Sequence, residues 1–279
     1  MKTPTSASVF AALASIAIMA GCIQTASAAT TINFASGADV TTAFPTTFFD
    51  VTADKSSASL GYDPGHGGRL NLSASSGTGA SAVANVFSGA SLSGQLDLFG
   101  NGSLTIRFDD VAMVLTGGGT ANSFSFGIAH RDTQSLTSSL TQRICFRINR
   151  SGTKVELLSQ GTVLATWTFG AGVYSNLEYA SFTLTSTTWS ATVVSATESD
   201  ESGTRSGIFA TALDPSAWTG FYIGLQATPG SSTASRVTDG YIGSITIGAI
   251  PEPATAGLFL AGFAGLVVSA LLVKRRCAR

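Results

Sequence analysis

Hydrophobic and polar residues alternate along several stretches in the middle of the chain. In SLTIRF (103–108) every second residue is apolar, and SFSFGI (123–128) repeats the pattern. Because successive side chains of a β-strand point to opposite faces, each stretch predicts a strand with one buried face. The side chains expected inside are Leu104, Ile106, Phe108, Phe124, Phe126 and Ile128.

The alternation continues as a meander of hairpins. An Asn-Arg-Ser-Gly turn separates QRICFRI (142–148) from KVELL (154–158), and a Ser-Gln-Gly turn leads on into 162–169. Short polar turns between alternating stretches are typical of β-hairpins. The apolar residues predicted to face inward here are Ile144, Phe146, Ile148, Val155, Leu157, Val163, Ala165, Trp167 and Phe169.

Four more strands are expected further along, at 180–185, 189–194, 220–226 and 240–247, with Trp189 starting a strand at an exposed sheet edge. Two stretches dominated by Ser, Gly, Thr and Ala, 73–81 and 227–235, are expected to be loops or a mobile edge. No helix is expected between these strands.

Many short strands joined by tight turns predict an all-β protein, a two-sheet antiparallel sandwich or jelly roll. Within 123–247 an FSFG strand, a hairpin meander, a DPSAW turn (214–218) and a GFYIGL strand (220–225) follow one another. This order resembles the concanavalin A-like lectin and glucanase fold. An immunoglobulin-like or another jelly-roll sandwich is the alternative.

The amino-terminal end has the features of a secretory signal peptide. Lys2 precedes an apolar run (9–20), and Ala26-Ser27-Ala28 forms an A-x-A site. A run too short to span a membrane, after a positive start, predicts export with cleavage near Ala28 or Ala29. Met-Ala-Gly-Cys (19–22) also resembles a lipobox, so a lipoprotein adhesin acylated at Cys22 is an alternative.

The carboxy-terminal end predicts a membrane helix. Residues 254–273 carry no charge, and as a helix they would extend about 30 Å, the thickness of a bilayer's hydrocarbon core. The basic residues that follow predict a cytoplasmic tail, because Lys and Arg accumulate on that side. These residues are Lys274, Arg275, Arg276 and Arg279.

Pro251-Glu252-Pro253 stands directly before the apolar run. A Pro-Glu-Pro triplet, one apolar helix and a terminal basic cluster, together at 250–279, resemble the PEP-CTERM sorting signal of Gram-negative bacteria. The resemblance implies an exosortase-type membrane peptidase as partner, transient anchoring in the inner membrane, and transfer to the cell surface or the extracellular space. The expected organisation is a signal peptide (1–29), an extracytoplasmic β-sandwich (30–249) and the sorting signal (250–279).

Charge and cysteine content narrow the function of the middle. Five of the 15 basic residues and one of the 16 acidic residues lie in the end segments. The middle therefore has ten basic and fifteen acidic residues, a net charge of about −5. Nucleic acid is therefore not an expected partner, because phosphate binding needs a basic surface. Only Cys145 remains between Cys22 and Cys277, so no disulfide is expected within the body.

Catalytic signatures are weak. Glucanases of the concanavalin A-like type carry two carboxylates on one strand face, and no E-x-D-x-E motif occurs here. Glu198 and Asp200 have the right spacing but stand in a polar ATESDESGT stretch that predicts a loop. A G-x-S-x-G elbow is also absent from the sequence. We therefore predict no enzyme and no catalytic residues, with a glycan-active hydrolase of divergent site as the alternative.

Metal sites are also not predicted. Asp109 and Asp110 could hold Ca²⁺ at a strand end, but an acidic turn is the simpler interpretation. His66 and His130 stand without Cys or carboxylate at ligand spacing, which argues against zinc. No metal and no cofactor are expected.

Three residues are candidates for ligand contact. Arg143 and Arg147 share the outward face of their strand, where they could meet sugar hydroxyls or carboxylated polysaccharide, although cross-strand pairing with an acidic residue such as Glu156 is the simpler interpretation. Tyr222 lies opposite Phe221 and Ile223 and could stack on a sugar ring. The sequence thus predicts an exported cell-surface or extracellular-matrix protein without enzymatic activity, with extracellular polysaccharide as a candidate partner.

Overall fold

The structure is a computed structural model of the chain. It describes residues 29–52, 56–76, 81–87, 102–117, 123–130, 143–149, 153–169, 176–197, 202–214, 218–227 and 236–248. The predicted signal peptide up to residue 28, the sorting signal at 250–279 and the acidic residues Glu198, Asp200 and Glu201 lie outside these ranges. No helix among the described residues is long and apolar enough to cross a membrane.

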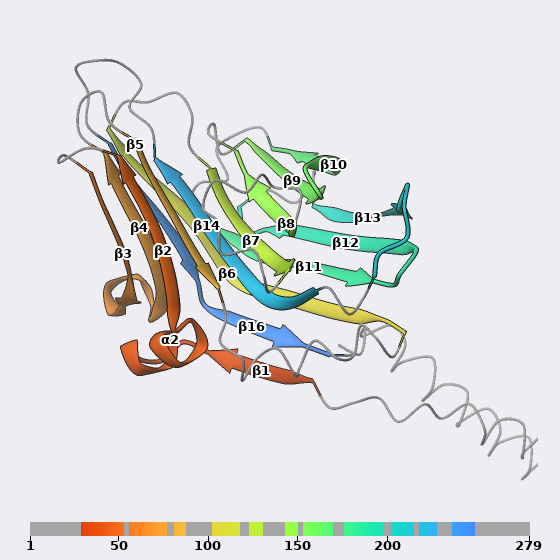
Figure 1. Cartoon of the computed structure of the whole chain (residues 1–279), viewed down its shortest axis with the longest axis horizontal. Coiled ribbons are helices and arrows are strands. Elements are labelled where there is room, and N and C mark those ends of the chain that lie inside the picture. Colours follow the sequence, from red (N-terminus) through yellow and green to blue (C-terminus); the bar gives the residue numbers. More distant parts are fainter. Residues whose placement is uncertain are drawn as a thin grey trace, which may run out of the picture.

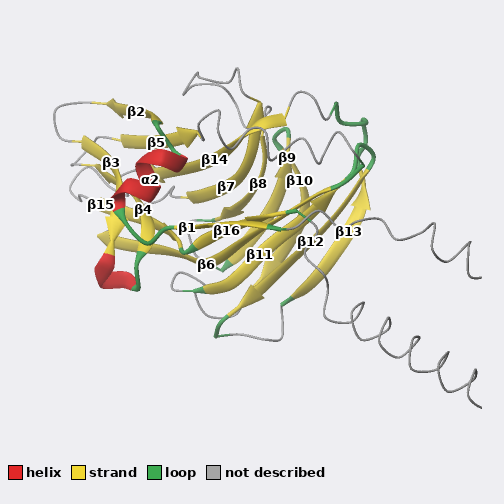
Figure 2. Ribbon diagram, turned by 90° about the horizontal axis from the view of Figure 1, so that it is seen from below, coloured by secondary structure: helices red, strands yellow, loops and turns green. Residues whose placement is uncertain are grey.

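Two antiparallel sheets form the body, as predicted, and they lie face to face in Figure 2. The seven-stranded sheet runs β10 (Thr162–Thr168), β9 (Lys154–Ser159), β8 (Arg143–Ile148), β7 (Ser123–His130), β14 (Trp218–Ala227), β5 (Ser81–Phe87) and β2 (Thr46–Thr52). The nine-stranded sheet runs β13 (Gly203–Ile208), β12 (Thr188–Ser195), β11 (Leu177–Leu184), β6 (Leu104–Gly117), β15 (Arg236–Ile242), β4 (Arg69–Ser76) and β3 (Ser56–Asp63). Its remaining strands are β16 (Ser244–Ile247), which pairs with β6, and β1 (Thr30–Asn33), which pairs with β16 (Figure 1).

One long strand, β6, serves two halves of the nine-stranded sheet. Its first half pairs with β16 and its second half with β15, while β11 lies along its other edge. The strand changes course at Asp110, which has a positive φ of 51°, and Gly243 separates β15 from β16 at the same point. The prediction that Asp109 and Asp110 close a strand is therefore wrong, because β6 continues through them to Gly117.

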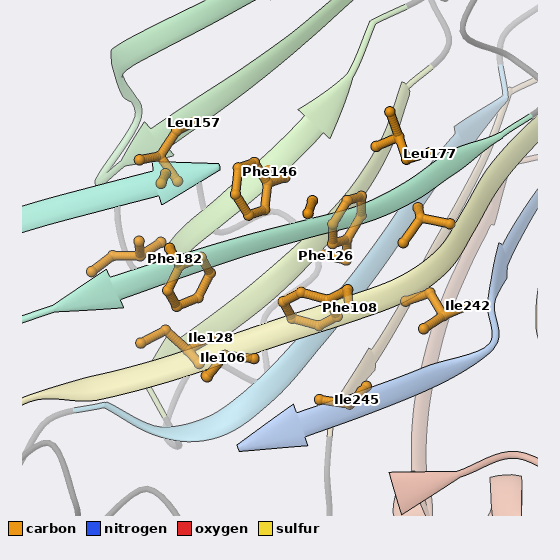
Figure 3. Packing of buried hydrophobic residues seen from close by; sticks show 14 of the residues in the cluster. Ile106, Phe108, Phe126, Ile128, Phe146, Leu157, Leu177, Phe182, Ile242 and Ile245 are labelled. Atoms are coloured by element: carbon orange, nitrogen blue, oxygen red, sulfur yellow. The ribbon is translucent and has the colours of Figure 1, made fainter. Parts of the chain in front are cut away.

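The core fills the space between the sheets, and the predicted inward residues of 103–108 and 123–128 are all fully buried. Phe126 and Phe146 of the seven-stranded sheet meet Phe108 and Phe182 of the nine-stranded sheet (Figure 3). Ring centroids 5.0 to 6.2 Å apart are within the range of favourable aromatic pairs.

Local irregularities account for the errors in the strand predictions. Val163 was expected inside, but a register shift between Val163 and Ala165 leaves it 43% exposed, while Trp167 is buried. Trp189 does not start an edge strand, because β13 pairs with β12 beyond it. The expected strand 240–247 is two strands, β15 and β16, interrupted at Gly243.

The predicted loops are partly strands. Residues 73–76 belong to β4, residue 81 opens β5 and residue 227 ends β14, whereas 77–80 and 228–235 lie outside the described residues. Two short helical segments were not predicted. They are α2 (Gly37–Ala43), which places Val40 and Ala43 in the core, and a 3₁₀ turn, η1 (Pro64–His66).

Candidate functional site

The three predicted contact residues belong to one sheet. In the register of the sheet, Tyr222 of β14 is opposite Gly127 of β7, and Gly127 is opposite Cys145 of β8. Arg143 and Arg147 flank Cys145 at two residues on either side. The Tyr222 side chain lies outside the described part of the chain, so its part in ligand contact stays a prediction.

The two arginines are held by the protein itself. Arg147 donates from Nε and Nη2 to Oε2 of Glu156 at 2.9 and 2.7 Å, so the predicted cross-strand pairing is confirmed. Arg143 is only 4% exposed. Cys145 lies between the two arginines in the sequence, and burial raises its pKa to about 12 although the charges of both arginines act in the opposite direction. Its thiol therefore stays protonated and unreactive at neutral pH.

The Asp109–Asp110 pair is engaged by cationic side chains. Asp109 accepts a hydrogen bond from Nε of Arg107 and another from Oγ of Ser244 at 3.2 Å, and Asp110 lies 3.6 Å from Arg69. Within the described ranges no group of three or more His, Cys, Asp or Glu side chains could hold a metal ion. Each carboxylate of this pair thus has a cationic side chain as its partner.

His66 does have a carboxylate beside it, contrary to the expectation from spacing. Its Nδ1 lies 2.7 Å from Oδ2 of Asp63, and the ring packs on Tyr241 with centroids 4.8 Å apart. The hydrogen bond with His66, together with one from the Gly65 amide, lowers the pKa of Asp63. Burial raises the pKa of Tyr241 to about 12, and the negative charges of Asp239 and Asp63 act in the same direction.

A broad polar surface covers the outer side of six strands of the nine-stranded sheet, and we call it the hydroxyl face. Its middle row crosses six neighbouring strands, with residues directly opposite one another in the register of the sheet. From β13 to β1 this row is Thr204, Thr192, Ser181, Arg107, Thr246 and Thr31. Five of the six side chains therefore carry a hydroxyl group.

Two flanking rows complete the hydroxyl face. On one side lie Ser206, Ser190, Thr183 and Thr105, and on the other lie Val194, Tyr179, Asp109, Ser244 and Asn33. All fifteen side chains of the three rows are exposed or partly exposed. The alternate residues of the same strands point into the core, as Ile106, Phe182 and Ile245 do.

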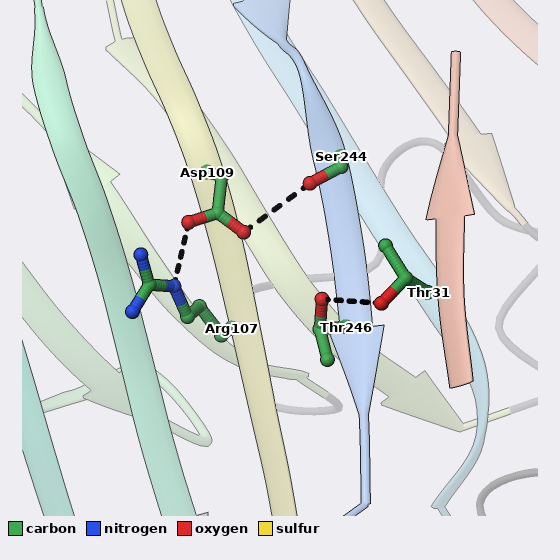
Figure 4. Close-up of polar contacts among 5 residues, drawn as sticks. All are labelled: Thr31, Arg107, Asp109, Ser244 and Thr246. Atoms are coloured by element: carbon green, nitrogen blue, oxygen red, sulfur yellow. Dashed lines mark hydrogen bonds and ion pairs between the residues drawn. The ribbon is translucent and has the colours of Figure 1, made fainter. Parts of the chain in front are cut away.

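Hydroxyl groups of neighbouring strands pair across the hydroxyl face. The Oγ1 atoms of Thr31 and Thr246 are 3.1 Å apart. The same distance is 2.9 Å between Thr105 and Thr183, and 2.7 Å between Thr192 and Thr204. The charged side chains in the rows also meet, since Arg107 bonds to Asp109, which accepts from Ser244 (Figure 4). The Arg107 guanidinium lies 3.8 Å from the centroid of the Tyr179 ring, a cation–π contact.

This surface was not predicted, although its signal is visible in the sequence. Apart from Arg107 and Val194, the outward positions of 103–108, 180–185, 189–194 and 244–247 are all Ser or Thr. What could not be read from the chain is the order of the strands, because β6 lies between β11 and β16, and β1 pairs with a strand more than two hundred residues later.

Comparison with known proteins gives no family: no family model matches the chain, and no curated protein matches it. Among solved structures, peanut lectin bound to a nine-residue peptide aligns at 12% identity over 80% of this chain and 98% of the lectin, with a TM-score of 0.47. A protein of unknown function from Shewanella oneidensis MR-1 aligns at 12% identity, over 89% and 96%, with a TM-score of 0.44. A metal-free lectin from Griffonia simplicifolia aligns at 14%, over 79% and 98%, with a TM-score of 0.42. These identities and TM-scores are too low to indicate a ligand or an activity for this chain.

Proposed function

We propose that the chain is an exported cell-surface or extracellular-matrix protein without enzymatic activity, and that its β-sandwich binds carbohydrate. In this proposal an exosortase-type membrane peptidase recognises Pro251-Glu252-Pro253 while the helix at 254–273 holds the protein in the inner membrane. The body would be of the concanavalin A-like jelly-roll class. The triplet, the uncharged run and the basic tail support the sorting step because they occur together and in order.

The hydroxyl face is the observation that carries the carbohydrate part of the proposal. Sugars present hydroxyl groups that both donate and accept hydrogen bonds, and Ser and Thr side chains can do the same. Hydroxyl groups on six adjacent strands, all accessible to solvent, offer many such partners at once. Thr is favoured in β-strands and Ser is tolerated there, so this composition lowers the stability of the sheet little.

The limits of the folded body support its role as cargo. Among the described residues, the first strand begins at Thr30, directly after the predicted cleavage site, and the last strand ends at Ile247, shortly before Pro251. Removal of both end segments would therefore leave every strand that the structure describes in place. A protein made to be released from a membrane tether needs this independence.

The sorting step can be tested in the native host with and without its exosortase. We expect a tagged chain to accumulate at full length in the inner membrane of the mutant and to reach the surface or the medium in the parent strain. Substitution of Pro251 and Pro253 by Ala should reproduce the mutant result in the parent strain. Identical fractionation in both strains would contradict the proposal.

The carbohydrate step can be tested separately with the mature protein on a glycan array. Binding to at least one class of glycan, without cleavage of the bound glycan over a long incubation, is the expected result. Hydrolysis of any array glycan would show that the protein is an enzyme. Absence of binding to every glycan would leave a structural component of the matrix.

A further inference from the structure

We infer that the hydroxyl face binds a neutral polysaccharide presented as an extended surface. The polymer chains would lie across its six neighbouring strands, β1, β16, β6, β11, β12 and β13. The inference rests on the carbohydrate binding proposed above.

The charge of the hydroxyl face favours a neutral partner. Its three rows contain one cation, Arg107, and this side chain already bonds to Asp109 and covers the Tyr179 ring. A further carboxylate, Glu178, is exposed at the irregularity where β11 begins. An acidic polysaccharide would therefore meet a slightly negative surface whose only cation is already engaged.

The chemistry of the rows suits hydroxyl groups in particular. A Thr hydroxyl carries one donor and two acceptor lone pairs, so each bonded pair, such as Thr192 with Thr204, keeps further capacity for a ligand. The β-branched side chain restricts rotation about χ1, and the cross-strand bond fixes the hydroxyl position. Binding then costs little side-chain entropy, because the contacting groups are already ordered.

The extent of the rows favours a broad ligand over a single sugar. Six strands at a spacing of about 4.8 Å give the middle row a length of roughly 24 Å, and rows on one face are about 6.7 Å apart. A contact of these dimensions suits several sugar units or several parallel chains. The binding of each unit is weak, and affinity comes from many simultaneous contacts.

A protein partner is a poorer fit. Protein interfaces have an apolar centre rich in aromatic side chains. The described exposed large hydrophobic residues are Val163 and Ile208, of which only Ile208 lies on this sheet, at the corner beyond Ser206. The single aromatic side chain in the three rows, Tyr179, has the Arg107 guanidinium over its ring.

The test compares retention of the mature protein on particles of three neutral polysaccharides, cellulose, a β-1,3-glucan and agarose, and on alginate gel as the acidic polymer. The main variant replaces Thr31, Thr192, Thr204 and Thr246 by Val, which removes four hydroxyl groups and keeps the β-branched shape. The matched control replaces the same four residues by Ser, which keeps the hydroxyl groups. A second variant, Thr105→Val with Thr183→Val, alters the neighbouring row, and thermal unfolding identifies any variant that does not fold.

We expect retention on at least one neutral polymer that is unchanged between about 0.1 and about 1 M salt, a range over which the Debye length falls from about 10 to about 3 Å. The four-residue Val variant should bind at least about tenfold more weakly, since each lost hydrogen bond weakens binding a few-fold. The Ser control should stay within about twofold of the unmodified protein.

Three results would overturn the inference. Unchanged binding by the folded Val variants would place the ligand elsewhere on the protein. Retention on alginate alone, lost at high salt, would contradict the neutral class while the proposed carbohydrate binding stands. Failure to bind any of the four polymers and any array glycan would overturn both this inference and the carbohydrate part of the proposed function.

Discussion

Thr30 and Ile247 lie directly opposite each other on β1 and β16, so the first and last of the described strands are neighbours in one sheet. Ile245 and Ile247 of β16 are buried in the core, and the strand also pairs with β6 on its other side. The Gly248 amide donates to the carbonyl oxygen of Thr105 at 3.0 Å, which extends this attachment by one residue. The body is therefore fixed almost up to the sorting motif.

Removal of β16 should destabilise the body strongly. A chain that ends at Gly243 loses two buried Ile side chains, each worth about 1.5 to 3 kcal/mol, and leaves β1 without its partner. We expect its free energy of unfolding to fall by at least about 3 kcal/mol, a large part of the 5 to 15 kcal/mol of a typical domain. Denaturant unfolding measures the change, and a chain that ends at Ala249 is the control. Equal stability of the two would contradict the structural role given to β16.

The short distance between the body and the motif should limit processing. Only Ala249 and Ile250 lie between Gly248 and Pro251. The three residue steps from Gly248 to Pro251 span at most about 11 Å, so a peptidase at the motif must work close to the folded sheet. We expect a flexible Gly/Ser spacer of about ten residues after Ala249 to accelerate loss of the carboxy-terminal segment, because such a spacer adds reach. Pulse-chase labelling measures the rate. Slower or unchanged processing would contradict this prediction and would indicate that the peptidase contacts the body as well as the motif.

The aromatic cluster between the sheets should dominate the stability of the body. Phe126 is fully buried, with ring centroids of Phe108, Phe124 and Phe146 within 5.0 to 5.6 Å. We expect Phe126→Ala to cost about 3 to 5 kcal/mol in thermal or denaturant unfolding. Val163→Ala is the matched control, because this side chain is 43% exposed and its truncation should cost less than about 0.5 kcal/mol. A comparable cost for both would contradict the assignment of the core.

Phe126 and Val163 show what the alternation of apolar and polar residues can and cannot predict. Alternation identified Phe126 correctly, because a buried strand face is a property of the strand itself. It failed at Val163 because the register shift next to it is set by pairing with β9. Strand β13 (GTRSGI) was missed for a related reason, since it has little apolar alternation and exists through its pairing with β12.

The hydroxyl face was even harder to predict, because it requires strands that are distant in the sequence to pair. Thr246 and Arg107 are predictable as outward residues of their own strands, but their meeting in one row requires β16 to pair with the middle of the chain. The pairing of Arg147 with Glu156 was predictable because a single hairpin joins their strands. Contacts within a hairpin follow from the sequence, whereas a surface assembled from six strands does not.

The Arg147–Glu156 ion pair should contribute modestly to stability. Both side chains are partly exposed, and two nitrogens of the guanidinium share one carboxylate oxygen. A double-mutant cycle with Arg147→Met and Glu156→Gln should give a coupling of about 0.5 to 1 kcal/mol, the upper range for exposed pairs. If Arg147 contacts a ligand, Arg147→Met should also weaken glycan binding more than Glu156→Gln does. Equal binding by both variants would remove Arg147 from the candidate contacts.

Stability at high pH should depend on Tyr241. Burial, reinforced by Asp239 and Asp63, raises the pKa of this phenol from 10.0 to about 12, so the folded state favours the protonated form. That contribution is fully present below pH 10 and is lost as the pH rises from 10 towards 12, because the unfolded chain ionises first. Tyr241→Phe keeps the ring beside His66 and should flatten this alkaline loss in unfolding experiments. An identical pH profile for the variant would contradict the assigned burial of the hydroxyl group.

Mass spectrometry of the protein recovered from its host most directly tests whether the chain is exported cargo with a temporary membrane tether. Protein from the surface or the medium should begin near Ala29 and should end before or within the apolar run at 254–273, with all residues of β1 to β16 retained. An acylated Cys22 at the amino terminus would support the lipoprotein alternative. Released protein that still carries residues 254–279 would contradict the proposed sorting.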